Sequence, residues 1–274
     1  MTARNLPVAL TIAGSDSGGG AGIQADLKTF HAFGVFGTSA LTAVTAQNTL
    51  GVQAIHPIPI DLVRSQIDSV ATDLRPDSIK SGMLATAELV ETVAQSILDH
   101  GLENYVLDPV MVATSGDRLL EEDAEDALRT QLIPLATLVT PNLHEARTLT
   151  GLPVDTLEDM RDAAVALVEM GAGAALVKGG HLDEGEVVDL FWDGERETTW
   201  RRAKLPARHT HGTGCTLSAA AAAGLALGAS LPEAADQAID FVARAIGTAP
   251  GLGQGNGPVN HFVGTTITRG LDQA

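Results

Sequence analysis

Short apolar runs and longer apolar stripes alternate along this chain, as they do where strands are followed by helices. Residues 8–13 form an apolar run typical of a buried strand, and the spacing of Ile23, Leu27 and Phe30 predicts a helix after it. Similar runs predict strands at 38–47, 105–111, 137–140 and 174–178, and a strand end with its loop at 78–84. Apolar stripes between capping residues and glycines predict helices at 61–73, 87–100, 122–132, 157–170 and 231–246.

This alternation predicts an α/β fold with a mainly parallel central sheet and helices on both of its faces. Residues 52–56 depart from it, because they alternate apolar and polar positions directly after a turn, which predicts a hairpin that reaches over a site. Asp193-Gly194 predicts a second hairpin. The sequence shows no internal repeat and no linker, so we expect one domain over 1–274.

Composition and charge exclude several classes of partner. Hydrophobic residues make up 45% of the chain and aromatic residues 3%, so aliphatic side chains must form the core. The formal net charge of −17 gives a surface that repels nucleic acid and anionic lipid, so we expect neither as a partner. The single cysteine excludes an intrachain disulfide and fits a reducing, cytoplasmic location. No apolar run predicts a signal peptide or a membrane span.

Residues 209–216 combine small polar residues with two glycines, and a run of alanines follows them. Glycine allows a tight turn and alanine favours a helix, so this stretch predicts a loop that opens directly into a helix. The free N–H groups and the positive dipole at such a helix start favour an anion, above all a phosphate. Cys215 lies there, where a thiol tends toward a lowered pKa. A simple turn with a small buried cysteine remains the alternative.

Polar residues also mark the ends of the other predicted strands. The glycine loop at 14–22 has neither the Walker pattern nor the dinucleotide spacing, so it is either a ligand loop or a flexible turn. Asp108 lies in an apolar strand and needs a partner or a cation, and Lys178 ends another strand. Asn142 and Glu145 have the spacing of a capping box, or they hold a hydrated Mg²⁺.

Seven segments, taken in order, resemble the hydroxymethylpyrimidine/phosphomethylpyrimidine kinases of thiamine biosynthesis, which belong to the ribokinase-like superfamily. The segments are 13–26, 46–49, 80–83, 108–111, 140–145, 178–181 and 209–218, and the similarity continues at 257–262. The resemblance therefore covers nearly the whole chain. It implies a ribokinase-like fold and an ATP- and Mg²⁺-dependent kinase. This kinase would phosphorylate 4-amino-5-hydroxymethyl-2-methylpyrimidine and then its monophosphate, and it would typically be a homodimer.

The resemblance also implies roles for individual residues. The pyrimidine pocket would be formed by Gly14, Ala21, Gln47, Met83, Val110 and Cys215, and within it Gln47 would read the polar edge of the ring. Asn142 and Glu145 match the N-x-x-E element that organises Mg²⁺ through water, and we assign the buried Asp108 to the same metal site. Lys178 would lie near the nucleotide phosphates. The anion hole for the transferred phosphoryl group would consist of the N–H groups of Gly212, Thr213, Gly214 and Cys215.

Cys215 and Thr45 bear on the reaction and on the substrate. Sugar kinases of the superfamily carry aspartate at the position of Cys215, so cysteine favours a vitamin substrate and is the expected base for the hydroxyl proton. An orienting role for Cys215 stays open. Thr45 stands where thiamine enzymes often carry an apolar residue, so its hydroxyl needs a partner in the pocket. The alternative functions are a pyridoxal kinase, as sole or second activity, and a non-catalytic pyrimidine-binding protein.

Overall fold

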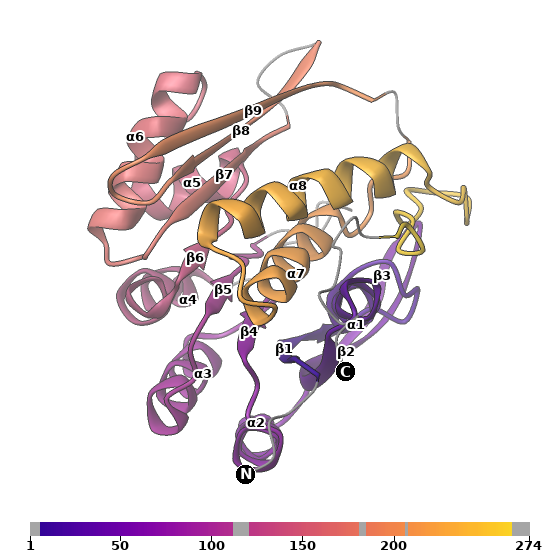
Figure 1. The fold of residues 1–274 in the computed structure, drawn as a ribbon. Helices are drawn as coiled ribbons and strands as arrows, with labels where there is room; N and C mark the ends of the chain where they lie inside the picture. The colour runs from indigo at the N-terminus through magenta and orange to yellow at the C-terminus, as the bar shows by residue number, and fades with distance from the viewer. Residues whose placement is uncertain (1–5, 112–120, 181–184, 206–207, 265–274) are drawn as a thin grey trace, which may run out of the picture.

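The computed structural model describes residues 6–111, 121–180, 185–205 and 208–264. Nine strands in these residues form one sheet: β1 (Val8–Ser15), β2 (Phe36–Asn48), β3 (Gly51–Pro57), β4 (Ser78–Ser81), β5 (Tyr105–Leu107), β6 (Leu138–Val139), β7 (Ala175–Gly179), β8 (Glu186–Trp192) and β9 (Glu197–Ala203). Their order is β3-β2-β1-β4-β5-β6-β7-β8-β9 (Figure 1). In this order, the six neighbouring strands β2, β1, β4, β5, β6 and β7 pair in parallel. At one edge β3 pairs antiparallel with β2, and at the other β8 and β9 continue the sheet with antiparallel pairs. The predicted, mainly parallel sheet is confirmed.

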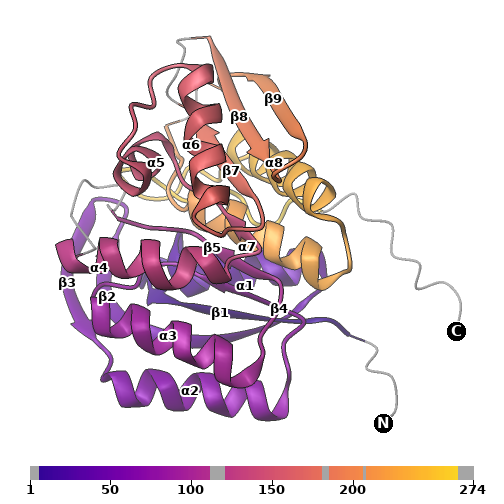
Figure 2. The same ribbon diagram turned by 90° about the vertical axis from the view of Figure 1, so that its left-hand side faces the viewer.

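Helices cover both faces of the sheet, as predicted (Figures 1 and 2). One face carries α1 (Gly22–Phe33), α7 (Thr213–Ala226) and α8 (Leu231–Gly247), and the other carries α2 (Ile60–Asp73), α3 (Ala87–His100), α4 (Glu122–Ala127), α5 (Leu143–Thr150) and α6 (Leu157–Glu169). One apolar core lies under each helix layer. Strand side chains alternate between the cores, because Leu10 and Ile12 belong to one and Ala9 to the other.

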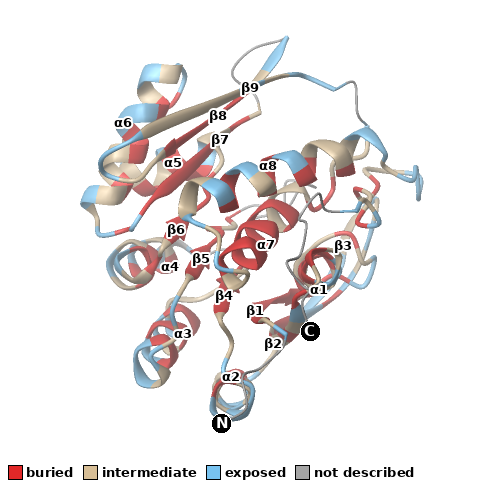
Figure 3. Ribbon diagram, viewed as in Figure 1, coloured by how far each residue is buried: buried red, intermediate tan, exposed pale blue. Residues whose placement is uncertain are grey.

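Helix α7 is buried on all sides between α1, α8 and the sheet (Figures 1 and 3). Every residue of it from Thr216 to Leu225 is buried, which is the expected place for a helix without a polar face. Its alanines let the neighbouring elements approach closely, and Ser78 of β4 donates a hydrogen bond to the carbonyl oxygen of Ala222 at 2.8 Å. In the described part of the chain, no helix has both the length and the apolar content needed to cross a membrane.

The predicted helix over 122–132 is present, but its second half is not a regular α-helix. Helix α4 ends at Ala127, and a π-helical turn (Leu128–Leu132) and a 3₁₀ turn (Ile133–Leu135) follow it. Pro134 has no N–H for a regular helical bond, and its ring would clash with the preceding turn of a regular α-helix, so the backbone changes its winding there. The predicted strand at 105–111 is also too long, because β5 ends before Asp108 and Pro109.

Both predicted hairpins are confirmed. β3 pairs antiparallel with β2, and Val52 of β3 lines the large cavity described below, so this hairpin does reach the site. β8 and β9 pair antiparallel around Gly194, whose φ of 91° is the left-handed conformation that glycine allows. The predicted helix over 87–100 is present as α3, with Thr86 as its N-cap and Gly101 as its C-cap.

Candidate active site

A cavity of about 1000 Å³ opens at the edge of the sheet where the parallel strands end. Ser15, Gly82, Asp108, Asn142 and Lys178 line it, at or just after the carboxyl ends of β1, β4, β5, β6 and β7. Ligands of open α/β sheets bind at this edge. The cavity brings together all the site residues predicted from the sequence: Gly14, Ala21, Gln47, Met83, Asp108, Val110, Asn142, Glu145, Lys178, Gly212, Thr213, Gly214 and Cys215. Of the predicted motifs, only His181 lies outside the described residues.

The loop before α7 forms a helix N-terminus that faces the cavity. Gly212 is the N-cap with a φ of 82°, and a side chain there would collide with the carbonyl oxygen of Gly20, so only glycine fits. The N–H of Thr213 is already used, because it donates to the carbonyl oxygen of Thr210 at 3.2 Å. Among the described residues, the N–H groups of Gly214 and Cys215 have no acceptor. These two groups are therefore available to an anion.

The expected low pKa of Cys215 is wrong. Burial raises the pKa of its thiol to about 11, although the Lys80 ammonium and the N–H of Gly22 act in the opposite direction. The carboxylates of Asp26 and Asp108 raise it further. The net shift is upward, so Cys215 is a neutral thiol at neutral pH.

A buried ion pair that the sequence analysis missed lies close to Cys215. Lys80 of β4 donates to both carboxylate oxygens of Asp26 of α1, at 2.9 and 3.1 Å, and Thr11 donates to the same carboxylate at 2.6 Å. All three residues are fully buried, and Lys80 lines the cavity. Burial lowers the pKa of Lys80, but the acidic groups around it, above all the Asp26 carboxylate, together raise it above its ordinary value, so the ammonium stays charged. A lysine within a predicted strand end was the available signal.

Lys178 lies between two carboxylates at the centre of the cavity. Its Nζ is 3.2 Å from Asp108 Oδ1 and 3.9 Å from Glu145 Oε2, and Ser218 of α7 donates to Asp108 Oδ2 at 3.2 Å. Burial raises the pKa of Glu145, the Lys178 ammonium lowers this pKa, and the Asp108 carboxylate raises it. Together these effects raise the pKa of Glu145 to about 7. Burial lowers the pKa of Lys178, but the two carboxylates raise it above its ordinary value. One fixed cation thus faces two acidic groups.

The capping box at the start of α5 is present. The backbone N–H of Glu145 donates to Asn142 Oδ1 at 2.9 Å, and the backbone N–H of Asn142 donates to Glu145 Oε2 at 2.7 Å. The same Glu145 oxygen is the one nearest to Lys178. The cap therefore fixes a carboxylate at the cavity wall, and the predicted Mg²⁺ role of Asn142 and Glu145 stays a prediction.

A second buried pair connects the two glycine loops. The ring Nε2 of His211 lies 2.8 Å from Asp16 Oδ2, and the same carboxylate accepts the backbone N–H groups of Gly18, Gly20 and Ala21. Burial raises the pKa of Asp16, but the hydrogen bonds from His211 and the backbone lower it below its usual value. Asp16 is therefore an ionised anchor for the first loop. Its place inside the 13–26 segment was the only sequence signal.

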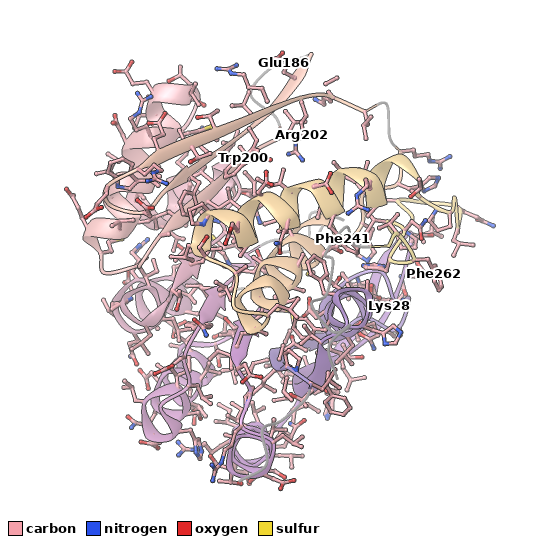
Figure 4. All side chains as sticks on the ribbon, viewed as in Figure 1. Lys28, Glu186, Trp200, Arg202, Phe241 and Phe262 are labelled. Carbon is pink, nitrogen blue, oxygen red and sulfur yellow. The ribbon has the colours of Figure 1, made fainter. Side chains whose placement is uncertain are left out.

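One end of the cavity lies between the β8–β9 hairpin and helices α7 and α8. Its apolar walls are formed by Val187, Leu205, Leu217, Val242 and Ile246, and the charged residues Asp189, Arg202 and Lys204 line it as well. Arg202 reaches from β9 toward α8 (Figure 4), where it donates to the carbonyl oxygen of Ile239 at 2.9 Å and pairs with Asp189. A flat apolar group fits this end of the cavity, close to the charged residues around Lys178.

The fold and this cavity together define an α/β phosphotransferase, in which a helix N-terminus and a lysine face an apolar slot. A family model described as phosphomethylpyrimidine kinase matches residues 16–260. The hydroxymethylpyrimidine/phosphomethylpyrimidine kinases of Bacillus subtilis and Streptomyces coelicolor are 49% and 52% identical to this chain, each over 93% of it and 94% of the relative. The chain belongs to the phosphomethylpyrimidine kinase family, and it is a kinase.

A solved structure supports the ribokinase-like fold implied by the resemblance. The Bacillus subtilis pyridoxal kinase in its ADP complex has a TM-score of 0.88 and 41% identity, and the match covers 94% of this chain and 98% of that one. The predicted family, fold class and enzyme class are therefore confirmed.

Proposed function

We propose that this kinase transfers a phosphoryl group from ATP to the hydroxymethyl group of 4-amino-5-hydroxymethyl-2-methylpyrimidine, and then a second one to the resulting monophosphate. The observation that carries the proposal is the arrangement of one cavity. A polar pocket around Gln47 and an apolar slot lie at its two ends, and the start of α7 lies between them. The names of the Bacillus subtilis and Streptomyces coelicolor relatives agree with this substrate.

At the pyrimidine end, Gln47 reads the polar edge of the ring, and Gly14, Ala21, Met83 and Val110 surround it. A side chain at Gly14 would lie 2.7 Å from the Met83 side chain, so glycine keeps room for a flat ring against methionine. Gln47 supplies both a donor and an acceptor, which an aminopyrimidine edge requires.

At the phosphate end, the free N–H groups of Gly214 and Cys215 stabilise the charge that develops on the transferred group. Phosphoryl transfer depends mostly on positioning and on such charge stabilisation. Lys178 neutralises the nucleotide phosphates. Cys215 faces the attacking hydroxyl, and its thiolate form takes the hydroxyl proton. Since the thiol pKa is raised to about 11 with the Lys80 cation already acting on it, this base form is the minor species at neutral pH.

Asp108, Asn142 and Glu145 offer oxygen ligands, which suit Mg²⁺ together with water and phosphate oxygens. In the described residues no group of three His, Cys, Asp or Glu side chains could hold a metal by itself, so the nucleotide must complete the site. The bound ion would supply positive charge at the transferred phosphate. The adenine of ATP occupies the apolar slot at the β8–β9 hairpin.

The test is ADP release by the purified protein with ATP and Mg²⁺, offered hydroxymethylpyrimidine, its monophosphate and pyridoxal in parallel. Turnover of both pyrimidines is the expected result. Turnover of pyridoxal alone would replace the proposal with vitamin B6 salvage, an alternative that the pyridoxal kinases among the structural relatives favour. Tight pyrimidine binding without ADP release would point to a non-catalytic binding protein. The homodimer and the cytoplasmic location stay predictions.

A further inference from the structure

The side-chain amide of Gln47 lies between two polar partners. One of its terminal atoms, placed as Oε1, is 3.2 Å from Thr45 Oγ1, and the other, placed as Nε2, is 3.5 Å from His211 Nε2. A half-turn of the amide exchanges its oxygen and nitrogen without changing its shape. The hydrogens of the two partners therefore decide which end faces which partner.

On the His211 side, the carboxylate of Asp16 sets the direction of the hydrogen bonds. This carboxylate accepts three backbone N–H groups, from Gly18, Gly20 and Ala21, so it is an ionised acceptor. His211 Nε2, 2.8 Å from Asp16 Oδ2, must carry a hydrogen and donate it. Protonated Nε2 has no lone pair, so the amide NH2 group cannot donate to it, and the end of the Gln47 amide that faces it has to be Oε1.

On the Thr45 side, a single hydroxyl hydrogen gives the same answer. Thr45 Oγ1 lies 2.8 Å from the carbonyl oxygen of Ser15, which can only accept. The hydroxyl hydrogen is used there, so Thr45 presents a lone pair to Gln47. The end of the amide that faces Thr45 has to be a donor, which is Nε2. The two partners, on different elements, therefore select the same half-turned amide.

We propose that Thr45 is a positioning residue: together with His211 it holds the Gln47 amide with Nε2 toward Thr45 and Oε1 toward His211, and so fixes the direction in which an aminopyrimidine ring binds. This inference deepens the proposed function and rests on it. In this orientation the amide accepts from the 4-amino group on the His211 side and donates to ring N3 on the Thr45 side. The hydroxymethyl group is attached next to the amino carbon, so it points toward the loop that leads into Gly212.

The orientation also predicts selectivity at one position of the ring. A 4-oxo analogue carries an acceptor in place of the amino group and an N–H in place of the bare N3. To bind this analogue, the Gln47 amide would have to make a half-turn, into the orientation that the hydrogen bonds of Thr45 and His211 both disfavour. We therefore expect the protein to prefer the 4-amino compound, and to lose that preference when Thr45 can no longer hold the amide.

The experiment measures calorimetric binding and turnover of 5-hydroxymethyl-2-methylpyrimidine as its 4-amino and 4-oxo forms. Thr45→Val should reduce the amino/oxo preference about tenfold, the size of effect expected from one orienting hydrogen bond. It should also lower kcat for the amino compound more than it raises KM, because the hydroxymethyl group is misdirected. Thr45→Ser keeps the hydroxyl and should restore both. In a Gln47→Met background, Thr45→Val should change nothing further.

Thr38→Val is the matched control, because Thr38 lies on the same strand and is equally buried. Its hydroxyl donates to the carbonyl oxygen of Ala9 at 3.0 Å, and Thr38 does not line the cavity. An unchanged preference in Thr45→Val, or an equal loss in Thr38→Val, would overturn the inference. So would failure of the wild type to prefer the 4-amino compound. Binding preference without turnover would leave the role of Thr45 standing and refute the proposed kinase substrate instead.

Discussion

Removing Lys80 should destabilise this protein more than removing any surface cation. Lys80 and Asp26 are both 0% exposed, and the described residues give the Lys80 ammonium no acceptor other than the Asp26 carboxylate. Lys80→Met would leave that carboxylate buried with only the Thr11 hydroxyl as partner. Breaking a buried pair in this way costs about 3–5 kcal/mol. For a chain of this length, roughly 2 °C is lost per kcal/mol, so Tm should fall by roughly 6–10 °C.

The assay is urea and thermal unfolding at neutral pH, with a double-mutant cycle. Lys80→Met combined with Asp26→Leu removes both charges, so the double variant should be more stable than Lys80→Met alone. Arg201→Met is the control, because its partner Glu186 lies 3.4 Å away and both side chains are about half exposed; it should cost less than about 1 kcal/mol. A cost for Lys80→Met as small as that of Arg201→Met, or additive effects of the two buried substitutions, would refute the reasoning.

The remaining predictions concern the reaction and its pH range. Cys215→Ala should lose most of kcat while pyrimidine binding, followed by calorimetry, changes little; near-normal kcat would show that the thiol is not the base. Glu145→Gln should weaken the dependence of the rate on Mg²⁺, and an unchanged Mg²⁺ titration would leave Glu145 only its role in the cap. Gly212→Ala should lower kcat about 100-fold by displacing the anion-binding loop, whereas Gly228→Ala, with a similar φ of 84° and open space around it, should leave kcat unaffected. Burial lowers the pKa of His261 to about 4 from an ordinary 6.5, so its neutral form contributes stability that is present above pH 6.5 and is lost as pH falls toward 4. Between pH 7 and pH 5 the wild type should therefore lose about 2 kcal/mol more unfolding free energy than His261→Gln, and equal losses in urea titrations would contradict this.

Local sequence signals predicted most of the fold because they are properties of neighbouring residues. The caps of α3, the hairpin at Gly194 and the helix of alanines all follow from residues a few positions apart. The failures occur where a proline competes with a longer pattern. Pro134 changes the winding after α4, and Pro109 follows the early end of β5, although the apolar pattern continues through both regions.

The sequence predicted which residues lie together at one cavity, but not the electrostatics of that cavity. The ordered motifs identified residues that the structure does bring to one cavity. The pKa of Cys215 was predicted in the wrong direction, because the helix N-terminus is visible in the sequence, whereas the burial of the thiol and the nearby Asp26 are not. The pairs Lys80–Asp26 and Asp16–His211 join residues 54 and 195 positions apart, so no local pattern could reveal them.

The structural and the functional interpretation of Asn142 and Glu145 turn out to be compatible. A capping box requires the Glu145 carboxylate to reach back to the backbone of Asn142, and the α5 start lies directly after β6, at the carboxyl edge of the sheet. The cap thereby holds this carboxylate in one rotamer, buried and 3.9 Å from Lys178. A fixed carboxylate at the cavity wall is what a metal site requires, because a ligand that is already ordered loses little entropy on binding. A motif that begins and stabilises a helix can therefore also place an acidic group at the end of the cavity that we assign to the phosphates.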